Sequence, residues 1–269
     1  MKRNGPLALA YHALFVVFML APILVTCAVA FTPEGFLSFP SHGLSLRWFK
    51  AIARHPEFVT AFEISLALAA LAATGALALA VPAALAIARY DFAGRTALEA
   101  LLLSPLMIPQ VVLGIAFLRF FSEVGLGNTL LGLFLAHVVI VLPFALRLTL
   151  ASAVGMDRGI EQAAVSLGGS AAAVARRVTL PLLLPGLLSG WALAFIQSFD
   201  DVTMTVFIAA PGTETLPVRM FLYIQDNIDP LVASVSALVI AFTTLMLILL
   251  DRSYGLDRLL VGHRRDEPA

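Results

Sequence analysis

The sequence predicts an all-α membrane protein with six transmembrane helices. Sixty per cent of its 269 residues are apolar, only 13% are charged, and the mean hydropathy is +0.96. Such a chain has too few polar residues to cover the surface of a soluble domain. The apolar residues gather in long segments, each near the roughly 20 residues that cross a bilayer. Backbone amides in lipid must be paired within their own segment, so these segments are expected to be helices.

We place six spans within a single domain that covers residues 1–269. They run approximately over residues 8–31, 61–88, 99–121, 129–150, 184–209 and 231–251. The first follows Lys2 and Arg3 and ends near Ala28-Val29-Ala30, like a secretion signal, but its apolar run exceeds the roughly 7–15 residues of a signal core. We therefore expect it to remain as an uncleaved span.

The joints and the next spans carry further local signals. Aromatic residues in the stretch 44–58 predict an amphipathic helix on the outer surface. In the third span, Pro105 and Pro109 precede Gln110, so this span is expected to bend where it lines a cavity, with Gln110 facing the solute pathway. His137, in the fourth span, is expected to be a hydrogen-bonded interior residue.

The third cytoplasmic joint, residues 152–183, is polar and patterned. Helical character is expected from Gly159 to Leu167, followed by a turn at Gly168-Gly169 and a second short helix from Ala171 to Val178. Pro181 is expected to precede the start of the fifth span. The last two spans, 184–209 and 231–251, then complete the bundle.

Basic residues predict the orientation. An inside N-terminus puts twelve of them on the cytoplasmic side and five outside, so both termini are expected in the cytoplasm. The twelve are Lys2, Arg3, Arg89, Arg95, Arg147, Arg158, Arg176, Arg177, Arg252, Arg258, Arg264 and Arg265. The five are Arg47, Lys50, Arg54, Arg119 and Arg219, and three of these lie in the first outer joint.

Two acidic residues, Asp200 and Asp201, lie in the outer half of the fifth span. An acidic side chain at mid-membrane costs about 2.5–3.5 kcal/mol, and such groups usually face a bundle interior or water. One interpretation is that one of them lines the pathway, with Gln197, and stabilises a cationic solute. The other is structural: a hydrogen bond to a neighbouring span, or a polar residue at a helix break.

The joint 152–183 resembles the EAA coupling loop of ATP-binding-cassette (ABC) importer permeases. That loop reads Glu-Ala-Ala, three residues, Gly, nine residues, Ile-x-Leu-Pro; this chain has Gln162-Ala163-Ala164, Gly168 and Val178-Thr179-Leu180-Pro181 at the same spacing. Gln162 replaces the Glu of the family, and Glu161 lies about 100° round the helix from it. The residues that the resemblance assigns to ATPase coupling are Glu161, Gln162, Ala163, Ala164, Gly168, Leu180 and Pro181.

The stretch 189–240 looks like the permeases of spermidine/putrescine-type importers. It carries their Ser-x-Asp-Asp element at residues 198–201, a Pro-Gly outer turn at 211–212, a Thr-Leu-Pro at 215–217 and a later Pro230. The resemblance implies a type I ABC importer permease fold and a multi-pass location in a bacterial inner membrane. The implied solute is a polyamine, with an aminophosphonate, an opine or ferric iron as alternatives.

The resemblance also implies the partners: a second, related permease chain, two ABC ATPase subunits, a periplasmic solute-binding protein and membrane lipid, but no nucleic acid. ATP and Mg²⁺ would bind the ATPases. The chain itself has no G-x-x-x-x-G-K-[ST] motif and no metal-ligand cluster in its sequence, so no cofactor and no enzymatic activity are expected of it. A stand-alone secondary transporter is the rival from another class; against it stand the coupling-loop pattern and the lack of two similar halves. A membrane enzyme is a third option, without a visible catalytic pair.

Overall fold

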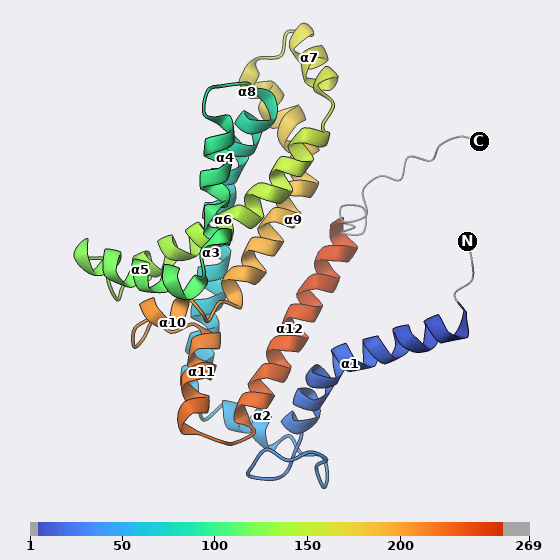
Figure 1. Cartoon of the computed structure of the whole chain (residues 1–269), viewed down its shortest axis with the longest axis vertical. Coiled ribbons are helices and arrows are strands. Elements are labelled where there is room, and N and C mark those ends of the chain that lie inside the picture. The colour runs from blue at the N-terminus through green and yellow to red at the C-terminus, as the bar shows by residue number, and fades with distance from the viewer. Residues whose placement is uncertain (1–4, 255–269) are drawn as a thin grey trace. The chain divides into compact units, whose positions relative to one another are not determined.

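The structure, a computed structural model, describes residues 5–254, and in this range every regular element is a helix. The described part of the chain divides into two compact units, residues 5–60 with 220–247 and residues 61–219 with 248–254. The elements are α1 (Pro6–Ala30), α2 (Arg47–Ile52), α3 (Pro56–Arg89), α4 (Arg95–Leu103), η1 (Ser104–Met107), α5 (Gln110–Glu123), α6 (Leu130–Gly155), α7 (Arg158–Ser166), α8 (Ala171–Val174), η2 (Ala175–Thr179), α9 (Leu180–Phe199), α10 (Thr205–Ile208), α11 (Leu216–Asp226) and α12 (Leu231–Tyr254) (Figure 1).

Four helices are long and apolar enough to cross a membrane: Leu7–Ala30, Pro56–Arg89, Leu130–Gly155 and Ala171–Phe199. A fifth span is possible if the bent pair Arg95–Met107 and Gln110–Glu123 counts as one, and Leu231–Met246 is a shorter apolar helix. The all-helical membrane fold is therefore confirmed, while the count of six spans stays a prediction. The predicted cytoplasmic position of the termini involves residues 1–4 and 255–269, including Lys2, Arg3, Arg258, Arg264 and Arg265, which lie outside the described residues.

The smaller unit holds α1 and most of α12 together near one end of each helix. Val29, Ala30 and Ala233 form a buried apolar cluster, with Phe49 packed against it. The Ser234 hydroxyl donates a hydrogen bond of 3.0 Å to the carbonyl of Ala30. Most of α1 exposes its apolar side chains; Phe18, for example, is 69% exposed. Such a surface fits lipid or another apolar partner rather than water.

The larger unit is built on small residues that let helices approach closely. The part of α3 in this unit buries a row of alanines at helical spacing: Ala69, Ala72, Ala73, Ala76, Ala80 and Ala84. Helices α6 and α9 run side by side (Figure 1). A Cβ atom on Gly186 would lie 2.4 Å from Ser152 Cβ and 2.9 Å from the carbonyl oxygen of Leu148, so only glycine fits there. A Cβ atom on Gly190 would lie 3.1 Å from the carbonyl oxygen of Ala145, so the close approach of the two helices continues there.

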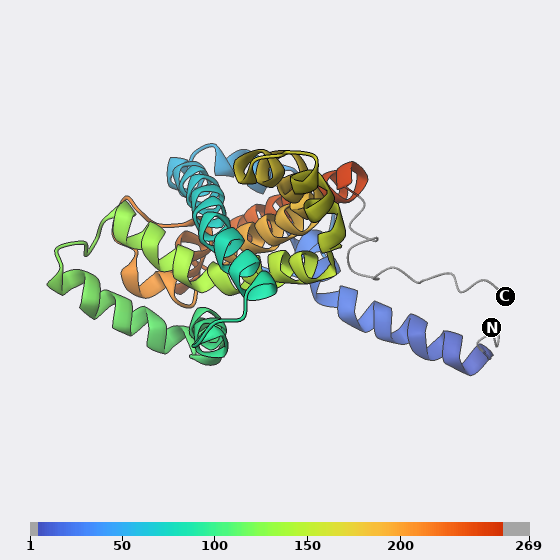
Figure 2. The same ribbon diagram turned by 90° about the horizontal axis from the view of Figure 1, so that it is seen from above.

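The third predicted span, 99–121, breaks into separate helices. The axes on either side of the break differ by 102°, and Figure 2 shows α5 lying across the direction of α4. Ile108 is extended, with φ −96° and ψ 129°, because the ring of Pro109 disfavours a helical conformation in the residue before it. The expected bend is present, but it is a full break in the helix rather than a kink.

Three further helix boundaries differ from the predicted ones. The expected helix over 44–58 is only α2, residues 47–52, because Pro56 occupies the first position of α3, where its missing N–H is not needed. The expected short helix 171–178 continues directly into α9. The N–H of Leu180 bonds to the carbonyl of Ala175, five residues back, and this π turn lets the helix continue past Pro181.

The fifth predicted span, 184–209, ends early. Helix α9 stops at Phe199, and the chain forms a separate short helix, α10, from Thr205. The carboxylate of Asp201 accepts the Thr205 N–H at 3.0 Å, and a side chain that binds the backbone in this way competes with helix continuation. Asp200 and Asp201 therefore lie at a helix end and not within a continuous span.

Candidate functional site

The predicted coupling loop forms the helix expected of it. Asp157 caps α7 by accepting the N–H of Gly159 at 2.8 Å. The helix is followed by Gly168 with φ +87°, a conformation that favours glycine. A Cβ on Gly169 would lie 2.8 Å from the carbonyl oxygen of Ala164. The turn therefore requires both glycines, and the helical character predicted for 159–167 is confirmed by α7.

The loop presents an apolar, small-residue surface. Gln162 and Ala163 are exposed, and Ala164 is half-buried. Leu180 and Pro181, at the start of α9, are also exposed. Leu167, at the end of α7, is 90% exposed. An exposed apolar patch on a rigid helix is typical of a contact with another protein. The roles of Gln162, Ala163, Ala164, Gly168, Leu180 and Pro181 in ATPase coupling stay predictions.

Glu161 points into its own chain. Its carboxylate accepts hydrogen bonds from the guanidinium of Arg89, at the end of α3, and from the hydroxyl of Thr179, in the π turn before α9. A neighbouring bond runs from Arg158 to the carbonyl of Ala88. We call Arg89, Glu161 and Thr179 the coupling-loop cluster. It joins α7 to two long helices, a role that the sequence alone did not assign to Glu161.

A second polar cluster lies at the other end of α9. His137 of α6 bonds through Nδ1 to Ser198 Oγ at 2.7 Å and through Nε2 to Thr205 Oγ1 at 2.9 Å. The Thr205 hydroxyl in turn donates to the Asp201 carboxylate at 2.6 Å. All four side chains are buried. We call His137, Ser198, Asp201 and Thr205 the histidine cluster.

The histidine cluster gives Asp201 the kind of hydrogen-bonded role that its structural interpretation describes, and its place in a solute pathway stays a prediction. Its carboxylate, in a residue only 6% exposed, is occupied by the backbone N–H and hydroxyl of Thr205. The predicted interior role of His137 is confirmed. Sequence reasoning missed that His137 and Asp201 share Thr205 as a partner. The only available signal was the presence of polar residues in apolar segments, which does not say which of them meet.

The other residues predicted to line the pathway, Asp200, Gln197 and Gln110, are not joined to one another by hydrogen bonds among residues 5–254. Asp200 is exposed at the end of α9, and Gln197 is half-buried one turn before it. Gln110 is the exposed first residue of α5, one turn before Gly114, where α5 packs against Phe207. No hydrogen bond among residues 5–254 joins these three. Their place in a solute pathway stays a prediction.

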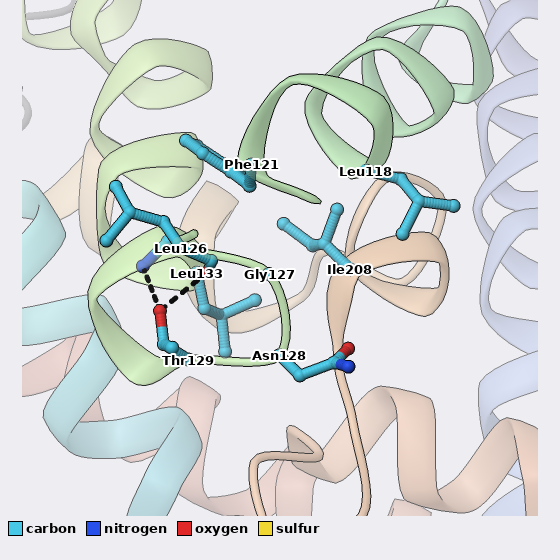
Figure 3. Close-up of a pocket in the computed structure, with 9 residues that line it drawn as sticks. Leu118, Phe121, Leu126, Gly127, Asn128, Thr129, Leu133 and Ile208 are labelled. Atoms are coloured by element: carbon cyan, nitrogen blue, oxygen red, sulfur yellow. Dashed lines mark hydrogen bonds between the residues drawn. The ribbon is translucent and has the colours of Figure 1, made fainter. Parts of the chain in front are cut away.

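A small hollow between α5, the α5–α6 turn and α10 is too small for a solute. It measures about 10 Å³ and is lined by residues that include Leu118, Phe121, Leu133 and Ile208, and Figure 3 shows these side chains around it. A volume of this size holds about one water. Thr129 closes its edge by donating to the Leu126 carbonyl at 2.7 Å and accepting the Gly132 N–H at 3.1 Å (Figure 3). Within residues 5–254 no group of three His, Cys, Asp or Glu side chains could hold a metal ion.

Comparison with known proteins covers most of the chain. A family model described as a binding-protein-dependent transport system inner membrane component matches residues 76–256. The spermidine/putrescine transport system permease protein PotC of Haemophilus influenzae is 30% identical over 248 residues, which cover 92% of this chain and 94% of that protein. The putrescine transport system permease protein PotI of Escherichia coli is 30% identical over 230 residues, covering 83% and 82%.

Two further similarities extend the comparison. A probable molybdenum ABC transporter permease of Haloferax volcanii is 34% identical over 180 residues, covering 64% of this chain and 66% of that protein. A crystal structure of a bacterial ABC transporter that imports the acidic polysaccharide alginate has a TM-score of 0.73, covering 95% of this chain and 100% of that one. At 13% identity this last likeness concerns the fold alone.

The matched residues include the predicted coupling loop from α7 to the start of α9 and every residue of both polar clusters. The chain therefore belongs to the family of inner membrane components of binding-protein-dependent transport systems, and its helices have the fold of an ABC importer permease.

Proposed function

We propose that the chain forms half of the translocation pathway of an ATP-driven importer whose solute is putrescine or spermidine. The observation that carries the proposal is the similarity to permeases named for these polyamines, which extends over 92% and 83% of this chain at 30% identity. A solute-specific likeness over almost the full length is stronger support than the coupling loop, because every importer of this family needs such a loop.

In the proposed mechanism α7 receives the movement of an ATPase and passes it to the membrane helices. The exposed surface around Gln162, Ala163 and Leu167 docks on the ATPase. The coupling-loop cluster then links α7 to α3 and to the helix that continues as α9. ATP and Mg²⁺ bind the ATPase subunits, and this chain contributes conformational change rather than chemistry.

The family's membrane components work with ATPases and a binding protein, and we propose the following subunits for the importer that contains this chain. A second, related permease completes the pathway, two ATPase subunits dock on the two coupling loops, and a periplasmic binding protein delivers the polyamine. Lipid covers the apolar faces that the second permease leaves free, including that of α1.

Asp200 is the better candidate of the acidic pair for contact with a cationic solute. It is exposed, whereas the Asp201 carboxylate is committed to Thr205. Gln197, three residues earlier on α9, lies on the same side of that helix. A carboxylate in a cavity of low dielectric attracts an ammonium group more strongly than it would in water.

The test is uptake of radiolabelled putrescine by a bacterium without its own polyamine importers, expressing this chain with its neighbouring ATPase, permease and binding protein. We expect saturable uptake that an ATPase variant without its P-loop lysine abolishes. Asp200→Asn is expected to raise the KM for putrescine, with Asp91→Asn, at a 97% exposed side chain outside both polar clusters, as a matched loss of charge. If the cells take up another solute but neither putrescine nor spermidine, the polyamine assignment is contradicted.

A different solute in the same importer class is the second candidate. The Haloferax volcanii relative named for molybdenum is 34% identical over 180 residues, so an oxyanion belongs in the same screen. Thermal-shift measurements on the partner binding protein, with putrescine, spermidine, molybdate, an aminophosphonate, an opine and ferric iron, separate the candidates. Uptake that persists with the inactive ATPase would instead indicate a secondary transporter.

A further inference from the structure

We propose that the basic face of α2 binds the anionic headgroup of a membrane phospholipid. Helix α2 lies between the end of α1 at Ala30 and the start of α3 at Pro56, two helices long enough to span the membrane. Consecutive spans joined by one loop have these ends on the same side of the bilayer. The loop is therefore at the level of the headgroups, where the membrane carries its phosphate groups.

Three cations lie on this element and directly after it. Arg47 and Lys50 are three residues apart on α2, and Arg54 follows two residues after the helix ends at Ile52. Together with Ser45, Trp48 and His55 they line a cleft of about 560 Å³ to which no acidic side chain contributes. Lys50 and Arg54 are exposed and form no ion pair among the described residues. His55 is paired with Glu57 at 2.9 Å, so three unneutralised charges remain for a ligand.

The base of the cleft is held in place by tertiary contacts. The buried Trp48 donates from Nε1 to the carbonyl of Glu34 at 3.0 Å. The guanidinium carbon of Arg47 lies 4.9 Å from the centre of the Trp48 ring, and Nη1 of the same group donates to the carbonyl of Pro33 at 3.3 Å. Phe49 contacts Phe31, with ring centres 4.9 Å apart. A helix of six residues is unstable alone, so these contacts give the cations a fixed base.

Apolar side chains beside the cations favour lipid over a soluble protein. In the loop before α2, Phe36 is 60% exposed, Phe39 62% and Leu44 86%. An element that combines exposed apolar residues with basic ones lies in the interface of a membrane, and tryptophan is enriched at the same level. The acyl chains near the headgroups can cover these apolar groups while phosphates neutralise the cations.

The charge of the lipid follows from the sequence. These three cations are the majority of the five basic residues predicted on the outer side, where the positive-inside rule disfavours them. An anionic headgroup such as that of phosphatidylglycerol compensates their charge, whereas a zwitterionic headgroup carries its own cation. Clustered Lys and Arg at a membrane surface recognise anionic lipids in this way.

The experiment measures lipid binding to the full chain, purified in complex with its partners, by native mass spectrometry with phosphatidylglycerol and phosphatidylcholine as probes. The variant is Lys50→Gln/Arg54→Gln, which spares Arg47 and its structural contacts. Its matched control is Arg95→Gln/Arg119→Gln, two cations on other helices with side chains 42% and 80% exposed, each paired with an acidic residue. We expect the apparent Kd for phosphatidylglycerol to rise about tenfold in the variant and to stay unchanged in the control.

Phosphatidylcholine binding is expected to be equal in all three proteins. The charge-retaining variant Lys50→Arg/Arg54→Lys should bind phosphatidylglycerol like the original chain, which excludes a folding defect as the cause. Equal phosphatidylglycerol binding by variant and control would overturn the proposal. So would a variant that keeps its lipid but loses ATPase stimulation by the binding protein, because the cleft would then be a protein-docking face.

Discussion

The two polar clusters at the ends of α9 differ in charge, in burial and in completeness. The coupling-loop cluster is ionic and partly accessible: the side chains of Arg89 and Glu161 are 22% and 14% exposed. The Nε of Arg89 is buried without a hydrogen-bond partner in the described part of the chain. In the histidine cluster both ring nitrogens of His137 have partners, and its four residues are buried.

The difference corresponds to what each end of α9 does. A fully paired cluster in a low-dielectric interior is costly to open, because each released group loses its partner without gaining water. An accessible ion pair costs less to rearrange, since water can replace either partner. We therefore expect the histidine cluster to fix α6, α9 and α10 as one body, and the coupling-loop cluster to be the end that adjusts as α7 moves.

The largest effect is expected from Asp201→Ala. This change leaves the Thr205 N–H and hydroxyl without their acceptor in a buried site, at a cost of about 3 kcal/mol in stability. Thermal denaturation in detergent measures the loss. The control is Asp200→Ala, the exposed neighbour, which should change stability by less than about 0.5 kcal/mol. Equal losses of stability from the two variants would show that the burial of Asp201 does not make it more important for stability than Asp200.

The contact of α6 with α9 comes next, because the histidine cluster depends on it. Gly186→Ala forces a Cβ against Ser152 and the backbone of Leu148, and such overpacking costs about 2 kcal/mol. Gly155→Ala, at the end of α6, meets no atom within 4 Å and is the matched control. A stable Gly186→Ala protein with unchanged putrescine uptake would mean that the helices separate without consequence.

The coupling-loop cluster should have a smaller effect on stability and a larger one on coupling. A double-mutant cycle of Arg89→Gln and Glu161→Gln is expected to give an interaction of about 1 kcal/mol that weakens in high salt. Transport per ATP hydrolysed should fall in each single variant, because α7 loses its ion pair to α3. If the ratio of solute transported to ATP hydrolysed stays constant while stability falls, the cluster has a purely structural role.

The smallest change in stability is expected at the next residue along α7. Gln162 is exposed, so Gln162→Glu should alter stability by less than about 0.5 kcal/mol. It restores the family's Glu on the outward face of α7 and should change only the affinity of this chain for the ATPase. Co-purification of the ATPase measures that affinity. Glu161→Gln is the inward counterpart, and similar effects from both would remove the distinction between the two faces of α7.

Elements with strong local signals were predicted well. The helix of the coupling loop, its glycine turn and the break near Pro109 follow from side-chain chemistry within a few residues, so they can be recognised without tertiary information. Helix ends were predicted less well. Helix α9 stops at Phe199 because Asp201 binds Thr205, and it starts early because a π turn accommodates Pro181. Neither bond leaves a periodic pattern in the sequence.

The sequence by itself determined that this chain is a helical membrane protein, because hydropathy and backbone pairing in lipid leave few alternatives, and it predicted a coupling loop at residues 152–183. It also indicated the family, through the spacing of residues 162–181. Only the tertiary structure decided which polar groups are free. Glu161 and Gln162 are neighbours, as are Asp200 and Asp201, yet in each pair one faces inward and is bonded while the other is exposed. Glu161 and Gln162 point about 100° apart on α7, and Asp200 and Asp201 lie just past the end of α9; what lies in each direction depends on elements distant in the sequence.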